Sequence, residues 1–272
     1  MNPTALTVFR WELRKLRFQK RTYLGLGAAV AVPIIFAVAT SVQSGGPDDV
    51  PFGRYIQTSG LAIPLVLLLF GSIWLYPLIT ALVAGDIIAS EDHNGTLKTI
   101  LTRSLGRGQI WRGKVLAAGS YATVAILLSG VVAIVAGCIV SGFNPLTTLS
   151  GTRVSAPTAL GLVAASLGFY LIPILSIACI GLLLSAVTRN SAAAIVGTLL
   201  FSLLLQLIAI LPGLGGLEPY LLSSQFDAWQ GLLRTPADWG PIIRSVWVCA
   251  LYAVPALIGS YFVFQRRDVA GG

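Results

Sequence analysis

The chain has 272 residues, of which 56% are hydrophobic and only 10% are charged, and its formal net charge is +8 at pH 7. Soluble domains carry about 25% charged residues, so this composition excludes a single soluble core and indicates a chain solvated by lipid. The basic excess does not indicate nucleic-acid binding, because the basic residues lie between apolar segments rather than in one folded patch.

The residues that build metal and catalytic sites are scarce. Cys138, Cys179 and Cys249 each lie within an apolar run, and the single histidine, His93, has no neighbouring Cys or His. We interpret the cysteines as small buried side chains and expect no metal site. The sequence also lacks a Ser/His/Asp or Cys/His set, so we expect no catalytic residues.

Residues 4–21 have the pattern of a basic amphipathic helix. Leu6, Phe9, Leu13 and Leu16 recur at helical spacing, and arginines occupy the neighbouring face. This pattern predicts a helix that lies in the membrane plane and meets anionic headgroups. The alternative is a solvated run of charge.

Six apolar segments are long enough to cross a bilayer, for which a helix needs about 20 residues. They cover residues 23–42, 61–85, 115–142, 158–187, 192–213 and 243–264. Among Asp, Glu, Lys and Arg, these segments contain Arg244 alone, at the start of the last one. We therefore predict an all-α membrane protein with one transmembrane domain over residues 1–272.

The distribution of Lys and Arg predicts the orientation. If both termini are cytoplasmic, 14 of the 18 basic residues lie inside, and the exceptions are Arg54, Arg153, Arg234 and Arg244. Cytoplasmic loops carry such an excess, so we expect a cell-membrane protein with both termini in the cytoplasm. Residues 86–114 then form a cytoplasmic loop.

The predicted outer segment 214–241 is rich in aromatic residues, among them Phe226, Trp229 and Trp239. Trp and Tyr favour the headgroup level, so this segment is either an interfacial anchor or a gate at the outer mouth.

The chain has no evident energy source of its own. Gly108–Val115 matches a phosphate-binding loop up to Gly113-Lys114, but Val115 replaces the Ser or Thr that holds magnesium. Ion-coupled transporters keep ionisable residues at mid-membrane, whereas here Gln206 is the one amide within a span. The apolar interior favours an apolar or amphiphilic substrate.

The third span carries a row of small residues with a period of four: Ala125, Ser129, Ala133 and Gly137. Such rows let helices approach closely, either within one bundle or between two copies of the chain.

The loop between the second and third spans resembles a known family. It reads Glu91-Asp92-His93-Asn94-Gly95-Thr96-Leu97-Lys98, continues through Arg103 and Arg107, and ends at Gly113-Lys114. This order is similar to the signature of ABC type-2 permeases, and the basic N-terminal helix and the ending Phe264–Val269 resemble that family too.

The resemblance implies the ABC type-2 exporter fold: six spans, an N-terminal in-plane helix, and a dimer of two permease copies. It implies a separate ATPase subunit that binds ATP and magnesium, with no cofactor in this chain. It makes the loop a coupling element whose candidate residues are Glu91, Gly95, Thr96, Leu97, Lys98 and Arg103. The rival interpretations are a membrane scaffold that transports nothing and an intramembrane enzyme.

Overall fold

The structure is a computed structural model, and it describes residues 4–42, 50–93, 106–211 and 216–266. The α-helices of these residues are α1 (Ala5–Leu16), α2 (Lys20–Val42), α3 (Ala62–Gly71), α4 (Leu75–Ala84), α5 (Ala89–His93), α7 (Arg107–Ser141), α8 (Ala156–Thr188), α9 (Ser191–Ile210) and α10 (Gly240–Gln265). Short 3-10 helices cover Gly53–Tyr55 (η1), Glu218–Tyr220 (η2) and Ser223–Leu233 (η3). Strands β1 (Leu146–Thr147) and β2 (Arg153–Val154) pair antiparallel, with Leu146 opposite Val154.

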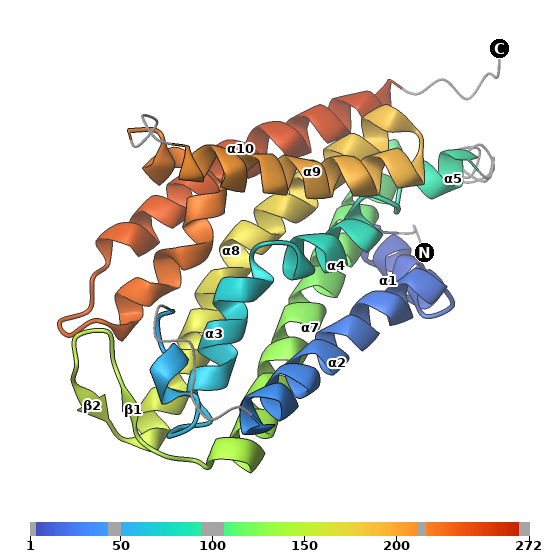
Figure 1. Cartoon of the computed structure of the whole chain (residues 1–272). Helices are drawn as coiled ribbons and strands as arrows, with labels where there is room; N and C mark the ends of the chain where they lie inside the picture. Colours follow the sequence, from blue (N-terminus) through green and yellow to red (C-terminus); the bar gives the residue numbers. More distant parts are fainter. Residues whose placement is uncertain (1–3, 43–49, 94–105, 212–215, 267–272) are drawn as a thin grey trace.

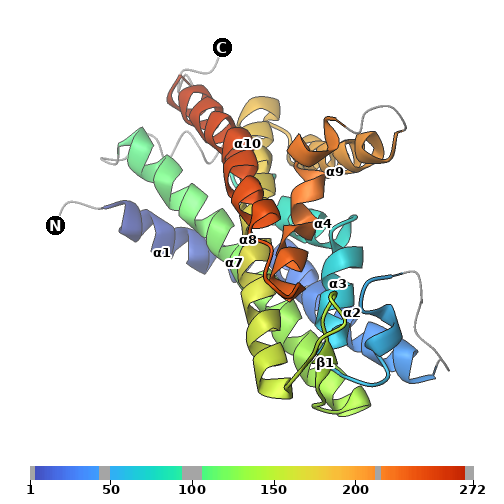
Figure 2. The same cartoon turned by 90° about the vertical axis from the view of Figure 1, so that its left-hand side faces the viewer.

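Five of the described helices, α2, α7, α8, α9 and α10, are long and apolar enough to cross a membrane. A sixth span is complete if α3 and the helical segment after it, bent by 63° at the break between them, are counted together. Helix α8 lies at the centre of the bundle, in contact with α4, α7, α9, α10 and η3. Helices α1 and α5 and the end of α10 gather at one end of the bundle, and the β1–β2 hairpin lies at the other (Figure 1). The same arrangement can be followed from the side in Figure 2.

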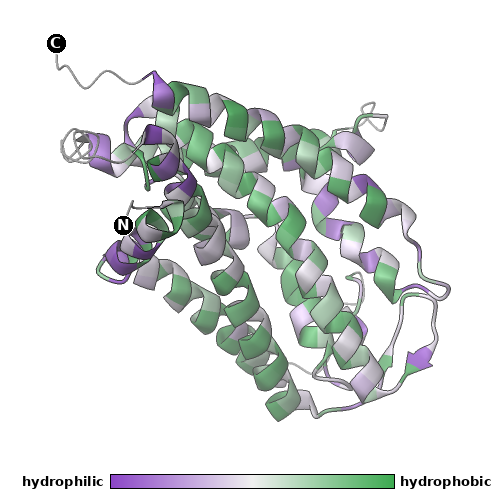
Figure 3. Cartoon of the chain, turned by 180° about the vertical axis from the view of Figure 1, so that it is seen from behind, coloured by the Kyte–Doolittle hydropathy of each residue, from purple (hydrophilic) through white to green (hydrophobic). Residues whose placement is uncertain are grey.

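The hydropathy of the surface differs between the helices and the two ends of the bundle. Apolar residues cover the long helices, and hydrophilic residues concentrate at the end that carries α1 (Figure 3). Large side chains such as Ile139, Leu207 and Leu251 are 78%, 58% and 62% exposed, which a soluble surface would not tolerate in such numbers. Lipid is the solvent for these faces.

The second span, expected to be continuous over 61–85, is broken at residues 72–74. Pro77 favours the break, because it has no N–H for the Ile73 carbonyl four residues earlier and its ring collides with that carbonyl in a straight helix. The side-chain amide of Gln206 on α9 replaces the missing backbone donor. It donates to the carbonyl oxygens of Ser72 at 2.7 Å and Ile73 at 3.3 Å. This amide therefore satisfies the backbone where the helix breaks.

Helix α1 ends at Leu16, before a turn that leads into α2, whereas the sequence pattern extended to residue 21. The buried face of α1 consists of Val8, Glu12 and Leu16, while Leu6, assigned to the apolar face, is 53% exposed. The helix is thus rotated relative to the face that hydrophobicity alone selects. Glu12 causes this, since its carboxylate enters the bundle to meet a buried cation.

The small residues of α7 face the chain's own bundle. Ala125, Ser129, Ala133 and Gly137 are all buried. A Cβ atom added at Gly137 would collide with the carbonyl of Gly60, just before α3. The Ser129 hydroxyl lies 3.1 Å from the hydroxyl of Tyr76 on α4, so α7 meets both halves of the broken span along this row.

The outer segment folds back against the bundle. Phe226 and Trp229 of η3 are 2% and 1% exposed, and the Trp229 ring stacks at 6.3 Å on Phe52. Phe226 packs 5.3 Å from Tyr170 of α8, which in turn lies 5.5 Å from Tyr76. The ring contacts from Phe226 through Tyr170 to Tyr76 thus run from η3 into the bundle.

Candidate functional site

The most unusual residue of the described chain is Lys114, whose side chain is fully buried near the start of α7. Its ammonium lies 2.8 Å from a carboxylate oxygen of Glu12 and 2.6 Å from one of Glu91. It also donates to the Ile87 carbonyl at 2.9 Å. A buried cation is tolerated only when paired and hydrogen-bonded, and these three acceptors meet that condition.

Glu91 extends the cluster to a second cation. Its side chain is 2% exposed and lies on α5, and the ammonium of Lys15 on α1 donates to it at 2.5 Å. The order of contacts is therefore Lys15, Glu91, Lys114 and Glu12. We call these four residues the ion cluster. It joins α1, which contributes two members, to α5 and α7, which contribute one each.

A glycine brings α1 close enough for these contacts. A Cβ atom at Gly113 would lie 2.6 Å from Val8 Cγ1 and 3.0 Å from the backbone nitrogen of Phe9. Only the absence of a side chain at Gly113 lets the backbones of α1 and α7 approach to this distance. The Gly113-Lys114 pair thus performs two structural tasks, close packing and charge pairing.

Further contacts hold the segment around Glu91 to the bundle. Asp86 pairs with Arg21 at the start of α2, and Asp92 lies 3.7 Å from the Arg189 guanidinium. The Ser185 hydroxyl of α8 accepts hydrogen bonds from the backbone N–H groups of Ile88 and Ala89, at 3.2 and 2.9 Å. The beginning of the predicted coupling loop is therefore fixed to α1, α2, α7 and α8.

Of the candidate coupling residues, the structure places Glu91 in the ion cluster. The others, Gly95, Thr96, Leu97, Lys98 and Arg103, lie outside the described residues. Glu12, Lys15 and Lys114 were not selected as site residues from the sequence. One signal existed: Glu12 is the one acidic residue of the basic N-terminal segment, and it lies four residues from both Val8 and Leu16.

The ion cluster joins three helices at one end of the bundle. Its members are paired with one another instead of facing a substrate. Short charge-assisted hydrogen bonds link the ends of α1, α5 and α7. The residues that precede the predicted coupling loop are thus connected to α7 through Glu91 and Lys114.

Comparison with known proteins identifies the family of the chain. A family model described as the ABC-2 family transporter protein matches residues 8–205, most of the chain and all members of the ion cluster. The chain belongs to the ABC-2 family of transporter proteins. It is an ABC-2 permease, the membrane subunit of an ABC transporter.

Individual relatives agree with this family. The chain is 29% identical over 224 residues to a probable ABC transporter permease protein NosY of Stutzerimonas stutzeri, covering 71% of this chain and 76% of the relative. It is 30% identical over 225 residues to the NosY protein of Pseudomonas aeruginosa, with 72% and 77% covered. It is also 26% identical to the uncharacterized protein YhcI of Bacillus subtilis, covering 71% of this chain and 64% of that relative. Permeases of this family work with an ATPase partner.

Proposed function

We propose that this ABC-2 permease exports an apolar or amphiphilic substrate by alternating access, driven by a separate ATPase subunit. The observation that carries the proposal is the ion cluster, which ties the predicted coupling loop to the third span through Glu91 and Lys114. ATP-driven closure of the ATPase pair would pull the loop, and the linked helices would tilt between two packed arrangements.

The orientation belongs to the same proposal. With both termini cytoplasmic, the ion cluster and the loop face the compartment that supplies ATP. The gathering of α1, α5 and the end of α10 at one end of the bundle supports this arrangement (Figure 1). We also propose a homodimer, so that each ATPase of a pair grips one permease.

ATP and magnesium would bind in the partner. Within this chain, the phosphate-loop match at 108–115 forms one continuous part of α7. The Lys114 ammonium is already occupied by two carboxylates, and the Gly113 backbone packs on Val8. A loop that cradles phosphate needs free backbone N–H groups and a free lysine, which this helix does not offer.

The outer segment supports a role as a gate. Phe226 and Trp229 fill the outer end of the bundle, so a path to the outside has to displace them. Trp239 and Tyr220 are 53% and 50% exposed, and because Trp and Tyr favour the headgroup level, this exposure supports an anchor role. We propose that this segment serves as both anchor and gate. Its exposed residues Trp239 and Tyr220 form the interfacial anchor, and its buried residues Phe226 and Trp229 form the gate.

The test is an ATPase assay of the permease reconstituted with its ATPase in nanodiscs. We expect the permease to change the ATPase rate, and Glu91→Ala to remove this change while the complex still assembles. Glu218→Ala, an exposed glutamate near the outer end, is the matched control and should behave as wild type. A permease that never changes the ATPase rate, or a Glu91→Ala protein that does so like wild type, would favour the non-transporting scaffold.

A further inference from the structure

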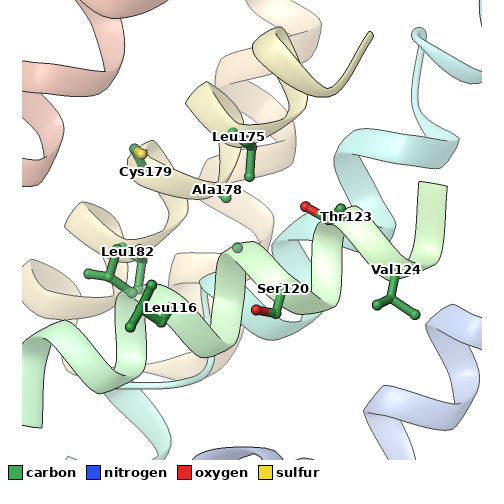
Figure 4. Close-up of a pocket in the computed structure, with 10 residues that line it drawn as sticks. Leu116, Ser120, Thr123, Val124, Leu175, Ala178, Cys179 and Leu182 are labelled. Atoms are coloured by element: carbon green, nitrogen blue, oxygen red, sulfur yellow. The ribbon is translucent and has the colours of Figure 1, made fainter. Parts of the chain in front are cut away.

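A pocket of about 530 Å³ lies between α7 and α8 in the half of the bundle nearest the ion cluster. Its walls include Leu116, Ser120 and Thr123 from α7 and Leu175, Cys179 and Leu182 from α8 (Figure 4). The volume is in the range of small-molecule sites, and the walls are mainly apolar. We call this pocket the α7–α8 groove.

The groove opens sideways into the bilayer. Leu116, Val124 and Leu175 on its rim are 50%, 55% and 37% exposed. Toward the ion cluster it is bounded by α10, because Trp111 donates to the Ser260 hydroxyl at 3.0 Å and that hydroxyl reaches the Leu182 carbonyl at 3.5 Å. An occupant therefore enters from the lipid phase and not along the axis of the bundle.

A cation marks the mouth of the groove. Arg112 is exposed and lies one helical turn before Leu116, on the same face of α7. No carboxylate among the described residues pairs with it, in contrast to Lys114 two residues later. The neighbouring Arg107 is engaged with the Gln265 carbonyl at 2.6 Å. Arg112 thus presents a positive charge, without a carboxylate partner in the described part of the chain, where the apolar groove reaches the headgroup level.

We propose that the α7–α8 groove binds one anionic phospholipid, with its phosphate at Arg112 and an acyl chain along the apolar wall. Charge complementarity selects an anionic lipid, and the lateral opening selects a membrane lipid over a water-soluble ligand. The proposal rests on the proposed orientation only in assigning this lipid to the cytoplasmic leaflet. Lipid binding needs no ATPase, so its failure and that of the transport function are distinguishable.

The test uses the full chain in detergent, incubated with phosphatidylglycerol or phosphatidylcholine and measured by native mass spectrometry. We expect wild type to retain one phosphatidylglycerol with a preference of about fivefold over phosphatidylcholine, as one basic residue at a lipid surface provides. Arg112→Gln should make the two lipids equal. Arg10→Gln, an exposed arginine on α1, is the charge control and should keep the preference.

Filling the groove tests the apolar wall. A Cβ atom at Gly119 would make an ordinary 3.7 Å contact with Leu175, so Gly119→Leu extends into the groove and should abolish retention of both lipids. Gly168→Leu is the matched control, since a Cβ there meets nothing within 4 Å. If Gly119→Leu does not fold, Cys179→Phe fills the groove from the opposite wall.

Wild-type lipid retention by the filled variants would overturn the proposal. So would a loss of dimer in the same spectra without loss of lipid, because a second copy of the chain would then occupy the groove.

Discussion

The Lys114 ammonium lies 2.6 Å from a carboxylate oxygen of Glu91, and both side chains are almost completely removed from solvent. Replacing Lys114 by Met would leave Glu12 and Glu91 buried without their shared cation. Breaking one partner of a buried pair costs about 3–5 kcal/mol, so we expect a large fall in the thermal unfolding midpoint of the detergent-purified protein.

The control for Lys114→Met is Lys20→Met, at an exposed position of α2, which should leave the midpoint unchanged. The triple variant Glu12→Gln, Glu91→Gln, Lys114→Met removes the unpaired charges together and should recover most of the loss. Equal midpoints for Lys114→Met and Lys20→Met would mean that the ion cluster does not hold these helices.

Gly113→Ala should displace α1. The added methyl would lie 2.6 Å from Val8 Cγ1, a distance that no relaxed contact reaches. Overpacking of this kind costs about 1–3 kcal/mol, and we expect faster proteolysis of the N-terminal helix together with reduced thermal stability. Gly27→Ala, with open space around it, should have no effect. Unchanged proteolysis of Gly113→Ala would contradict the close approach of α1 to α7.

Gln206→Leu should destabilise the break in the second span. It removes the donor for the Ser72 and Ile73 carbonyls, and an acceptor left unsatisfied away from water costs about 1–3 kcal/mol. Adding Pro77→Ala should recover part of this loss, because the substituted residue supplies an N–H to the Ile73 carbonyl. Leu207→Ala on the lipid-facing side of α9 is the control. A Gln206→Leu protein that unfolds at the wild-type temperature would show that the Gln206 amide does not stabilise the break.

The apolar spans could be predicted from the sequence because lipid imposes a length and a composition on every crossing helix. The break between α3 and α4 could not be predicted with the same ease, since hydropathy is continuous through residues 61–85. Pro77 alone does not decide it, as Pro33, Pro173 and Pro255 all lie within helices that continue. Gln206, which is distant in sequence, stabilises the break between α3 and α4. Tertiary partners of this kind are not visible in local sequence.

The ion cluster likewise has one part that could be predicted from local sequence and another that depends on tertiary contacts. Glu91 could be selected because it lies in a recognisable loop, whereas Gly113-Lys114 could be recognised only as the pair that opens a span. Pairing Lys114 with Glu12 requires the docking of α1, which depends on the small size of Gly113 as well as on the burial of Val8 and Leu16. A pattern search treats Glu12 as an exception on a basic helix, yet its burial determines which face of that helix turns inward.

The orientation can be tested with single cysteines in a chain whose Cys138, Cys179 and Cys249 are replaced by Ala. Arg153→Cys lies on the β1–β2 hairpin, at the end of the bundle opposite α1, and should react with a membrane-impermeant maleimide applied to intact cells. Ser104→Cys, in the segment between α5 and α7, should react only after the membrane is permeabilised.

The physical reason is the retention of positive charge on the cytoplasmic side. The segment that contains Ser104 carries Lys98 and Arg103 and leads directly into Arg107 of α7, whereas the hairpin carries Arg153 alone among basic residues. Labelling after permeabilisation serves as the control that the Ser104→Cys thiol is reactive at all. Reversed labelling of the two cysteines would place the coupling loop outside the cell, away from ATP, and the proposed contact with an ATPase would be impossible.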